Sequence, residues 1–332
     1  MTGEAGPVRW AVLGPGRIAE SFVAGLRETR TGVLAGIGSS DPNRARAVAD
    51  RLGAQHAGRY DDMIGRDDVD AVYVSSIHPA HLELAEAALR AGRAVLCEKP
   101  LTLTAADTAH LIATATAVGV PLVEAYKNRF SPFARALESA VALGGIGGGL
   151  RLRASFGFRA EPREGRLFDP ALGGGALLDV GGYPLALAVQ VAEAAGVALG
   201  ALRIGDVAGR IGPTGVDEHA RAVVIAPGFT AHVETSIRSE LPRSAEVVGD
   251  RGRVVLPDAW GSRLASAGEL RIVDDAGERV ERPAVVNPFA AEADAVAELL
   301  VRGEIESPAM PWAHSIAVAR LLDDWAAALR HA

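Results

Sequence analysis

The first third of the chain alternates short apolar runs with segments of helical periodicity. The run at residues 70–75 is apolar through its centre, which is typical of a strand buried on both faces of a parallel sheet. Residues 17–29 instead place Ile18, Phe22 and Leu26 on one helical face. Strands are expected at 8–13, 33–38, 70–75, 94–97 and 122–125, and helices at 17–29, 79–91 and 105–118. This rhythm predicts an α/β fold with a doubly wound parallel sheet and right-handed crossovers.

After about residue 130 the pattern changes to successive strands joined by turns such as Ala226-Pro227-Gly228. Strands are expected at 151–159, 201–211, 220–226, 230–236, 245–248 and 253–256, and helices at 175–195, 290–302 and 313–329. We therefore expect two domains, residues 1–126 and 127–332, the second being an α+β domain built on an open, mainly antiparallel sheet. A sheet face that no helix covers favours a homodimer or a higher homo-oligomer through that face.

Composition narrows the class of protein. Of the 332 residues, 49% are hydrophobic and 23% are charged, which is ordinary for a soluble globular protein. The net charge of −7 provides no basic surface for nucleic acid or an anionic membrane. The single cysteine, Cys97, excludes an internal disulfide framework, and no spacing of histidines predicts a metal site. With neither an N-terminal export signal nor a membrane-spanning apolar run, the expected location is the cytoplasm.

A glycine-rich turn follows the first expected strand and opens the first expected helix. Gly14-Pro15-Gly16-Arg17-Ile18-Ala19 has the spacing of a dinucleotide-binding turn, with Ala19 at the third small position. The first glycine makes the tight turn, the second lets the backbone approach a pyrophosphate, and the small third residue allows close helix–strand packing. The turn therefore predicts an N-terminal Rossmann domain that binds a nicotinamide dinucleotide at a helix N-terminus.

The end of the second expected strand bears on the choice between NADP and NAD. An acidic residue there would bind the ribose 2′-hydroxyl and repel a 2′-phosphate, but this chain has Ser39 and Ser40, with Arg44 on the next helix. Asp41 precedes Pro42 and is expected to cap that helix, so that backbone amides occupy its carboxylate. These residues favour NADP, with NAD as the alternative.

The segment at residues 94–102, AVLCEKPLT, ends another buried strand with Glu98-Lys99-Pro100. Ligands of open α/β sheets bind outside the carboxyl ends of the strands, and lysine is a residue whose charge can be tuned for catalysis. Lys99 is therefore a candidate catalytic residue. A cis peptide between Lys99 and Pro100 would help to aim its ammonium group into the cleft.

At this point the chain resembles the glucose–fructose oxidoreductase / inositol dehydrogenase / rhizopine-catabolism (Gfo/Idh/MocA) family over essentially its whole length. Four segments carry the resemblance: GPGRIA at 14–19, the block at 72–102 that ends in EKPLT, EAYKNRF at 124–130 and GGGALLDVGGYPL at 173–185. The resemblance implies an N-terminal Rossmann domain and a C-terminal domain whose open antiparallel sheet often forms dimers or higher oligomers.

The resemblance also implies a catalytic set of Lys99, Asp179 and Tyr183. The i, i+4 spacing of Asp179 and Tyr183 predicts that both side chains share one helix face, directed across the cleft toward Lys99. Many relatives have histidine where this chain has Tyr183, and tyrosine in a GYP context is similar to the dihydrodiol and xylose dehydrogenase branch. A buried structural ion pair between Lys99 and Asp179 is the alternative.

A tyrosine can act as the base only if its pKa is lowered. Its pKa must fall from about 10 to about 7–8, which corresponds to about 3–4 kcal/mol. An ammonium about 4 Å away supplies on the order of 4 kcal/mol at an effective dielectric constant near 20. We therefore expect Lys99 to lower the pKa of Tyr183, so that Tyr183, or Lys99 relaying to it, accepts the substrate proton while Asp179 orients the lysine and the sugar hydroxyls.

The remaining candidates lie at loop positions around the expected cleft. His78, near the nicotinamide by resemblance, is as well explained by cofactor or substrate contact as by packing, and for His81 helix capping is at least as well supported as a chemical role. Lys127 fits either a pocket that takes a polar or anionic substrate or a solvated surface. The full expected cofactor set is Gly14, Gly16, Arg17, Ile18, Ala19, Ser39, Ser40, Arg44, Ser76, His78, His81, Glu98 and Lys99, and the expected substrate set is Lys127, Arg129, Arg166 and Phe168.

These observations lead to three functional hypotheses. The first is an NAD(P)-dependent oxidoreductase that transfers hydride between the cofactor and a secondary alcohol or ketone of a sugar, polyol or cyclic trans-diol. The second keeps the cofactor tightly bound and moves hydride between two sugars. The third is a non-catalytic NAD(P)-binding regulator on the same fold, which the joint presence of Lys99, Asp179 and Tyr183 disfavours.

Overall fold

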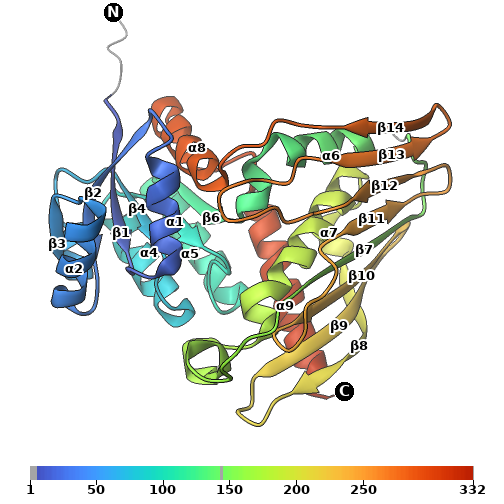
Figure 1. Ribbon diagram of the computed structural model, residues 1–332, viewed down its shortest axis with the longest axis horizontal. Helices are drawn as coiled ribbons and strands as arrows, with labels where there is room; N and C mark the ends of the chain where they lie inside the picture. Colours follow the sequence, from blue (N-terminus) through green and yellow to red (C-terminus); the bar gives the residue numbers. More distant parts are fainter. Residues whose placement is uncertain (1–5, 143–144, 332) are drawn as a thin grey trace, which may run out of the picture.

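The computed structural model describes residues 6–142 and 145–331, and it contains two sheets that lie side by side, each packed against helices (Figure 1). The N-terminal half alternates strand and helix, as the sequence predicts. Its elements are β1 (Val8–Leu13), α1 (Arg17–Leu26), β2 (Gly32–Gly38), α2 (Pro42–Leu52), β3 (His56–Gly58), α3 (Tyr60–Ile64), β4 (Ala71–Val74), the 3₁₀ turn η1 (His78–Ala80), α4 (His81–Arg90), β5 (Ala94–Glu98), α5 (Ala105–Val118) and β6 (Leu122–Ala125).

The first sheet has the strand order β3-β2-β1-β4-β5-β6, and every adjacent pair is parallel. The predicted Rossmann sheet is therefore confirmed. The sequence missed β3 and α3, because three residues of strand and five of helix are too short for a periodic signal. The order reverses between β1 and β4, and open α/β sheets bind ligands in the crevice at that point.

The C-terminal half contains the larger sheet, in the order β14-β13-β12-β11-β7-β10-β9-β8. Adjacent strands are antiparallel apart from β7 and β10, so the predicted mainly antiparallel sheet is confirmed with one parallel pair. Its elements are η2 (Lys127–Phe130), α6 (Pro132–Ala142), β7 (Leu150–Gly157), η3 (Arg166–Phe168), η4 (Pro170–Leu172), η5 (Leu177–Gly181), α7 (Gly182–Ala194), η6 (Leu199–Ala201), β8 (Arg203–Ile211), β9 (Asp217–Ala226), β10 (Phe229–Ser236), β11 (Ala245–Val248), β12 (Arg253–Leu256), β13 (Leu270–Asp274), β14 (Gly277–Glu281), α8 (Pro288–Arg302) and α9 (Trp312–Leu329).

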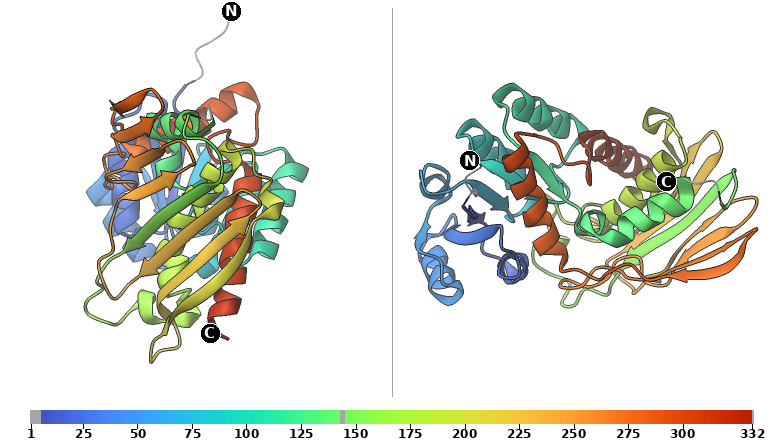
Figure 2. Two further views of the ribbon diagram at one scale, coloured as in Figure 1. Left: turned by 90° about the vertical axis from the view of Figure 1, so that its right-hand side faces the viewer. Right: turned by 90° about the horizontal axis from the view of Figure 1, so that it is seen from above.

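Helices cover only one face of the second sheet. α6, α7 and α9 lie on its inner side, whereas the outer side faces the viewer without a covering helix in the left view of Figure 2. The alternation along β9 follows from this arrangement, because Ala220, Ala222 and Val224 are buried while the residues between them are partly or fully exposed. On the outer face Ile225 keeps 44% of its surface exposed.

Helix α8 comes from the C-terminal half of the chain but packs on the Rossmann sheet, against α1 and β5. Gly25 of α1 makes the close approach possible, since a Cβ atom there would lie 2.6 Å from the Cβ of Phe289. Asn287 caps α8 and also donates a hydrogen bond to Glu28 at the end of α1. The last third of the chain therefore helps to build the wall of the N-terminal half.

The apolar stretch Pro170–Ala194 is the one segment of the described residues that is long and apolar enough to cross a membrane. It is a core helix instead, because 83% of its most apolar window is buried inside the protein. Within it, Leu185, Ala188 and Val189 have no exposed surface, as expected of a helix packed between a sheet and its neighbouring helices.

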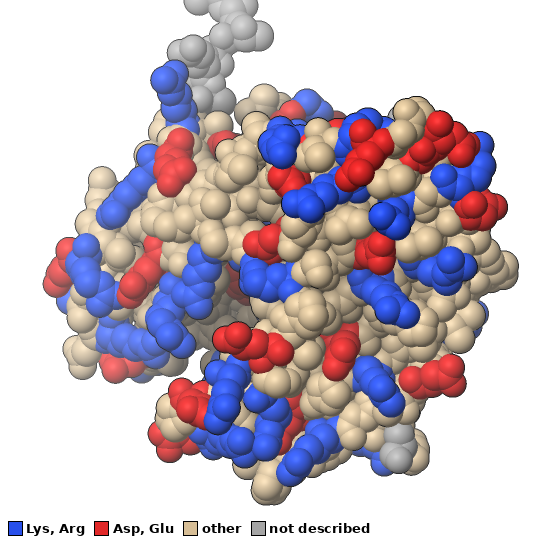
Figure 3. All heavy atoms as spheres, turned by 45° about the vertical axis from the view of Figure 1, so that its right-hand side comes forward, with Lys and Arg blue, Asp and Glu red and all other residues tan. Residues whose placement is uncertain are grey.

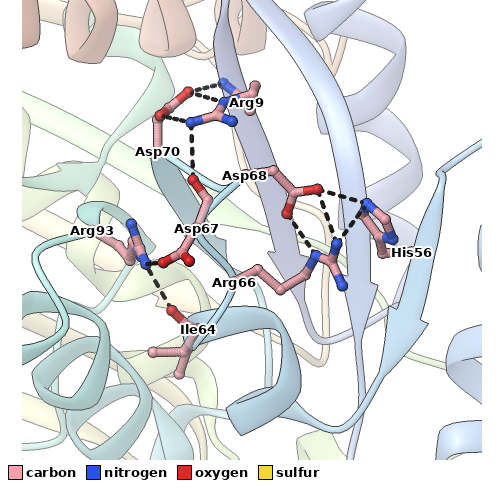
Figure 4. Close-up of polar contacts among 8 residues, drawn as sticks. All are labelled: Arg9, His56, Ile64, Arg66, Asp67, Asp68, Asp70 and Arg93. Atoms are coloured by element: carbon pink, nitrogen blue, oxygen red, sulfur yellow. Dashed lines mark hydrogen bonds and ion pairs between the residues drawn. The ribbon is translucent and has the colours of Figure 1, made fainter.

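Charged groups at the amino edge of the first sheet are paired with one another (Figure 4). Arg9 donates to both carboxylate oxygens of Asp70, at 2.8 and 2.6 Å, and Arg66 donates to both oxygens of Asp68, at 2.7 and 2.9 Å. His56 lies 2.9 Å from Asp68. These pairs join the start of β1, the start of β3 and the loop before β4, at the edge opposite the expected ligand crevice.

Candidate active site

The glycine turn between β1 and α1 forms a cradle at a helix N-terminus. Gly14 has φ +107°, and a Cβ atom there would lie 2.6 Å from the Ser76 nitrogen, so a side chain has no room. At Gly16 a Cβ atom would meet nothing within 4 Å, which leaves the N-terminus of α1 open to a ligand. No side chain caps that N-terminus, and Ala19 is fully buried. The turn has the shape and the free amide donors that a dinucleotide pyrophosphate requires.

The end of β2 is arranged as the sequence predicts. Ser39 is 2% exposed and its hydroxyl accepts a hydrogen bond from the Asp41 amide at 3.2 Å. The Asp41 carboxylate caps α2 by accepting from the Asn43 amide at 2.9 Å. Arg44 is exposed, and its guanidinium donates to the Pro15 carbonyl at 3.2 Å, which brings it beside the glycine turn. Ser40 and Arg17 are exposed, while Ile18 is partly buried.

Lys99 lies where the two halves of the molecule meet. The peptide between Lys99 and Pro100 is cis, as predicted, and the Lys99 ammonium donates to the Asp179 carbonyl at 2.5 Å. The same nitrogen lies 5.1 Å from the centre of the Tyr183 ring. Tyr183 is 8% exposed, and its hydroxyl makes no hydrogen bond to any other described residue. The structure therefore brings the three predicted catalytic residues together.

The local geometry of Asp179 differs from the prediction of one shared helix face. Residues Leu177–Gly181 form a π turn before α7 begins at Gly182. The Asp179 carboxylate therefore turns toward Arg166, which donates to it at 2.8 Å, and Lys99 binds the Asp179 main-chain carbonyl rather than the carboxylate. Asp179 thus contacts the lysine through its main chain, and its carboxylate pairs with Arg166 rather than forming the alternative ion pair with Lys99.

The electrostatics of Tyr183 are also opposite to the expectation. Burial raises its pKa well above 10, and the carboxyl groups of Glu98, Glu292 and Asp179 raise it further. Lys99 faces the ring of Tyr183, but the cation that lowers the pKa of this phenol is Arg263, and burial together with the three carboxyl groups outweighs it. In this arrangement Tyr183 holds its proton firmly, so the expected lowering of its pKa by Lys99 is wrong.

His78 and His81 are buried at the carboxyl end of β4. His78 Nδ1 lies 2.9 Å from the Gly173 carbonyl, which links the two halves of the protein, and burial lowers the pKa of His78 to about 3. His81 Nδ1 lies 2.9 Å from the Pro100 carbonyl, and burial lowers its pKa to about 4. Both rings are therefore neutral near pH 7. His81 fixes the loop that follows Lys99, whereas His78 ties that region to the second half.

Sequence reasoning missed a buried acidic residue beside the site. Glu292 of α8 has no exposed surface, and neither carboxyl oxygen has a hydrogen-bond partner among the described residues. Burial raises its pKa well above 4.5, and neighbouring Glu98 adds to this effect. Glu98 accepts a hydrogen bond from the Tyr73 hydroxyl at 2.5 Å, and burial raises its pKa too. No local signal marks Glu292, since α8 reaches the site only through tertiary packing.

The predicted substrate residues divide into two groups. Arg166 and Phe168 line a hollow of about 440 Å³ in the second half, together with Arg163, Asp169 and Leu172. In Figure 3 the surface is hollowed between the two halves, and Lys and Arg side chains gather on both sides of the opening.

The predicted substrate residues at the domain junction have different surroundings. Lys127 donates to the Ser262 carbonyl at 3.1 Å, beside a second hollow of about 490 Å³. Arg129 is 4% exposed and paired with Glu138 of α6, so it belongs to a buried structural cluster and lines neither hollow. Among residues 6–142 and 145–331, no group of three or more His, Cys, Asp and Glu side chains is placed to hold a metal ion.

A six-stranded Rossmann sheet with an open glycine cradle, and a lysine at a strand end facing a second half, define a dinucleotide-binding α/β protein with its cleft between the halves. Family models identify the relatives. Residues 8–126 match the oxidoreductase family with an NAD-binding Rossmann fold, and residues 134–255 match the GFO/IDH/MocA C-terminal domain. The chain belongs to the Gfo/Idh/MocA family of NAD(P)-dependent oxidoreductases.

Individual relatives are similar along nearly their whole length. The trans-1,2-dihydrobenzene-1,2-diol dehydrogenase of Mus musculus is 33% identical, over 96% of this chain and 95% of that protein. The D-xylose 1-dehydrogenase (NADP⁺) of Hypocrea jecorina is 27% identical, over 96% of this chain and 90% of that protein. The 3-ketoreductase KijD10 of Actinomadura kijaniata, solved with NADP and TDP-benzene, has a TM-score of 0.84 and 27% identity, covering 98% of this chain and 97% of that one. These relatives act on CH–OH groups or the corresponding ketones.

Proposed function

We propose that this protein is an NADP-preferring oxidoreductase that interconverts a secondary alcohol and a ketone on a sugar, polyol or cyclic trans-diol. One observation carries the proposal: the Lys99 ammonium meets both the Asp179 carbonyl, at 2.5 Å, and the face of the Tyr183 ring, at 5.1 Å, beside the cofactor cradle. A cation and a buried phenol held together at the edge of a dinucleotide site are the groups that alcohol–ketone chemistry requires.

Different residues would bind the cofactor, transfer the proton and stabilise the developing charge. A bound nicotinamide supplies or accepts the hydride, and Gly14, Gly16 and the N-terminus of α1 would hold its pyrophosphate. In reduction Tyr183 gives its proton to the carbonyl oxygen, and in oxidation it takes the proton back. Lys99 stabilises the negative charge that develops on that oxygen. Because the pKa of Tyr183 is raised, the phenol carries its proton in the free site, which is the form that reduction requires.

The preference for NADP is part of the proposal and rests on Ser39, Ser40 and Arg44. At the end of β2 one oxygen of the Asp41 carboxylate is engaged in capping α2, and the exposed guanidinium of Arg44 lies next to the glycine turn. A 2′-phosphate would find a cation there rather than a repelling anion. The xylose dehydrogenase relative named for NADP⁺ and the KijD10 complex with NADP support this choice.

The substrate wall in this proposal combines aromatic and charged groups. Phe156 stacks on Trp260 with ring centres 5.6 Å apart, and both contact the Tyr183 ring edge-on at 5.0 and 5.9 Å. Such a wall suits the C–H face of a sugar or a cyclic diol. Arg166 is available for a hydroxyl group, because its Nη2 holds Asp179 while its Nη1 has no partner among the described residues.

The open sheet face and the cellular location complete the proposal. Ile225 and Val223 of β9 lie beside Thr230 and His232 of β10 on the outer face, and two copies that meet there would bury these two apolar side chains. We expect a cytoplasmic homo-oligomer with residues 127–332 as its assembling domain. Sedimentation of the native protein against an Ile225→Lys variant tests it. Equal masses, with both samples monomeric, would contradict the interface.

The catalytic proposal is tested by a substrate panel. Purified protein is mixed with NADPH or NADH and ketoses or cyclic diketones, and with NADP or NAD and aldoses, inositols and trans-diols, while absorbance at about 340 nm is followed. We expect turnover with at least one class and a higher kcat/KM with the phosphorylated cofactor. Cofactor binding without turnover on any member of the panel would favour the regulator hypothesis instead.

A further inference from the structure

Glu124 lies in β6, directly beneath the loop that carries Lys99. Its register partner in β5 is Cys97, two residues before Lys99. The Glu124 side chain is 4% exposed, and its Oε1 accepts a hydrogen bond from the Leu101 amide at 2.9 Å. One carboxyl oxygen of β6 therefore fixes the main chain two residues beyond the proposed catalytic lysine.

The other oxygen of Glu124 has no partner. Oε2 is buried without a hydrogen bond, and so is the hydroxyl of Ser315, a residue of α9 that is 2% exposed. Ser315 lies close enough to lower the pKa of Glu124. Neither Oε2 nor the Ser315 hydroxyl has a hydrogen-bond partner among the described residues, and a buried carboxyl oxygen without a partner is destabilising. Stability alone therefore does not explain an acid at this position.

Several ionisable groups surround this carboxyl. Burial raises the pKa of Glu124 to about 7 and the charge of Glu98 also raises it, while Ser315, the Leu101 amide and Lys99 act in the opposite direction. Glu124 in turn raises the pKa of Cys97, which is already raised by burial. It has the same effect on Tyr126, the next but one residue along the chain.

We propose that Glu124 is a positioning residue for the proposed reaction, which fixes the loop from Lys99 to Leu101 and changes the electrostatic environment of Lys99 when it gains or loses its proton. As a carboxylate it accepts the Leu101 amide more strongly and stabilises the Lys99 ammonium. As a neutral acid it accepts the Leu101 amide more weakly and stabilises the Lys99 ammonium less. Glu124 touches neither substrate nor cofactor in this role, and the proposal rests on the function proposed for Lys99.

Two variants at this position separate geometry from charge. Glu124→Gln keeps an oxygen that can accept from the Leu101 amide but carries no charge, whereas Glu124→Leu removes both. We expect Glu124→Leu to lower kcat by about tenfold or more, with the KM for the cofactor nearly unchanged, since small displacements of a catalytic group cost that much. In the wild type we expect kcat to change near pH 7, where Glu124 gains or loses its proton. Glu124→Gln should keep most of the kcat but should not show this change. Ser315→Ala, which removes the nearby hydroxyl, should leave the maximal kcat close to the wild type and move the change in kcat to higher pH, because Ser315 lowers the pKa of Glu124.

A stability measurement tests the proton independently of turnover. The pKa of Glu124 is about 7 in the folded protein against an ordinary value of 4.5, so folding favours its protonated form. Stability relative to Glu124→Gln should therefore be greatest below about pH 4.5 and fall as the pH rises to about 7. If no substrate is turned over by the wild type, the proposed function fails while this readout still tests Glu124.

Three results would overturn the inference. They are a stability difference that does not change with pH, a Glu124→Gln enzyme that keeps the change in kcat near pH 7, and a folded Glu124→Leu enzyme with wild-type kcat at every pH. Thermal unfolding and NADPH binding establish that each variant is folded. If Glu124→Leu does not fold, the inference is tested by the pH dependence of kcat and of stability in Glu124→Gln.

Discussion

The two edges of the Rossmann sheet, at the amino and carboxyl ends of its strands, differ in whether their charged groups are paired. At the amino edge Arg9 binds both oxygens of Asp70, and the two side chains are 42% and 34% exposed (Figure 4). At the carboxyl edge Glu124 and Glu292 are buried with three carboxyl oxygens that lack a partner in the described part of the chain. The first edge satisfies its charges within the protein. The second leaves them unsatisfied, as sites that act on a ligand do.

The carboxyl groups at the two edges also differ in their pKa values. At the amino edge the Arg66 guanidinium holds the pKa of Asp68 far below its usual range, and Arg9 lowers that of Asp70. At the carboxyl edge burial raises the pKa of Glu98, Glu124 and Glu292. The paired carboxylates of Asp68 and Asp70 therefore stay charged near neutral pH, whereas Glu124 at the carboxyl edge has a pKa of about 7 and can exchange a proton there. Four substitutions measure how far this difference extends, from the largest expected effect to the smallest.

Lys99→Met should have the largest effect. It removes the cation at the carboxyl edge that stabilises a developing oxyanion, and we expect kcat to fall by about a thousandfold or more. The glycine cradle does not depend on Lys99, so NADPH affinity measured by fluorescence should stay within about threefold. Substantial residual turnover would mean that the ammonium has a structural role, namely the bond to the Asp179 carbonyl.

Tyr183→Phe should follow, with a loss of about 10²- to 10⁴-fold in kcat, because it removes the proton donor but keeps the ring contacts with Phe156 and Trp260. Tyr126→Phe is the matched control. Tyr126 is also fully buried with an unpartnered hydroxyl, and its ring lies 5.9 Å from that of Tyr183. Comparable losses in the two variants would show that packing, not proton transfer, explains the effect.

Much of the carboxyl edge could be read from the sequence because its signals are local. The turn from Gly14 to Ala19 and the strand that ends in Glu98-Lys99-Pro100 each combine a short motif with a neighbouring apolar run. The register of the sheet then brings them to one edge without further information. The Asp41 cap was equally readable, since it needs only residues 41–43.

The features that escaped prediction depend on distant contacts. Glu292 reaches the site because α8 returns to the first sheet after the strands of the second sheet, and nothing in its own helix marks that path. The π turn before α7 depends on its surroundings, including the bond from the Leu177 amide to Asp217 of β9 at 2.6 Å. Arg129 was predicted to bind substrate because it lies in the EAYKNRF segment, but its side chain is directed toward Glu138 on α6. Tertiary packing decides each of these side chains.

Arg44→Ala should have an intermediate effect, confined to the cofactor. Loss of the guanidinium beside the glycine turn should weaken NADP binding by about tenfold, or about 1.4 kcal/mol, and leave NAD binding nearly unchanged. Arg46→Ala, on the same helix and also exposed, is the control. Ser39→Asp should shift the preference in the same direction by repelling the phosphate. Affinity ratios that stay constant in both variants would refute the assignment of NADP.

Asp70→Asn should have the smallest effect and is the most direct test of the contrast between the edges. The pair with Arg9 is partly exposed, so the expected loss of stability is at most about 1 kcal/mol, with kcat unchanged. Because Arg9 lowers the pKa of Asp70, the contribution of the pair is present near neutral pH and is lost as acid protonates Asp70, so the difference between variant and wild type should shrink as the pH falls below the ordinary aspartate pKa of about 3.9. Thermal unfolding from pH 7 down into this acid range measures this. A fall in kcat with stability preserved would show that the amino edge also acts on the site, and the division of the sheet into a structural and a catalytic edge would then be wrong.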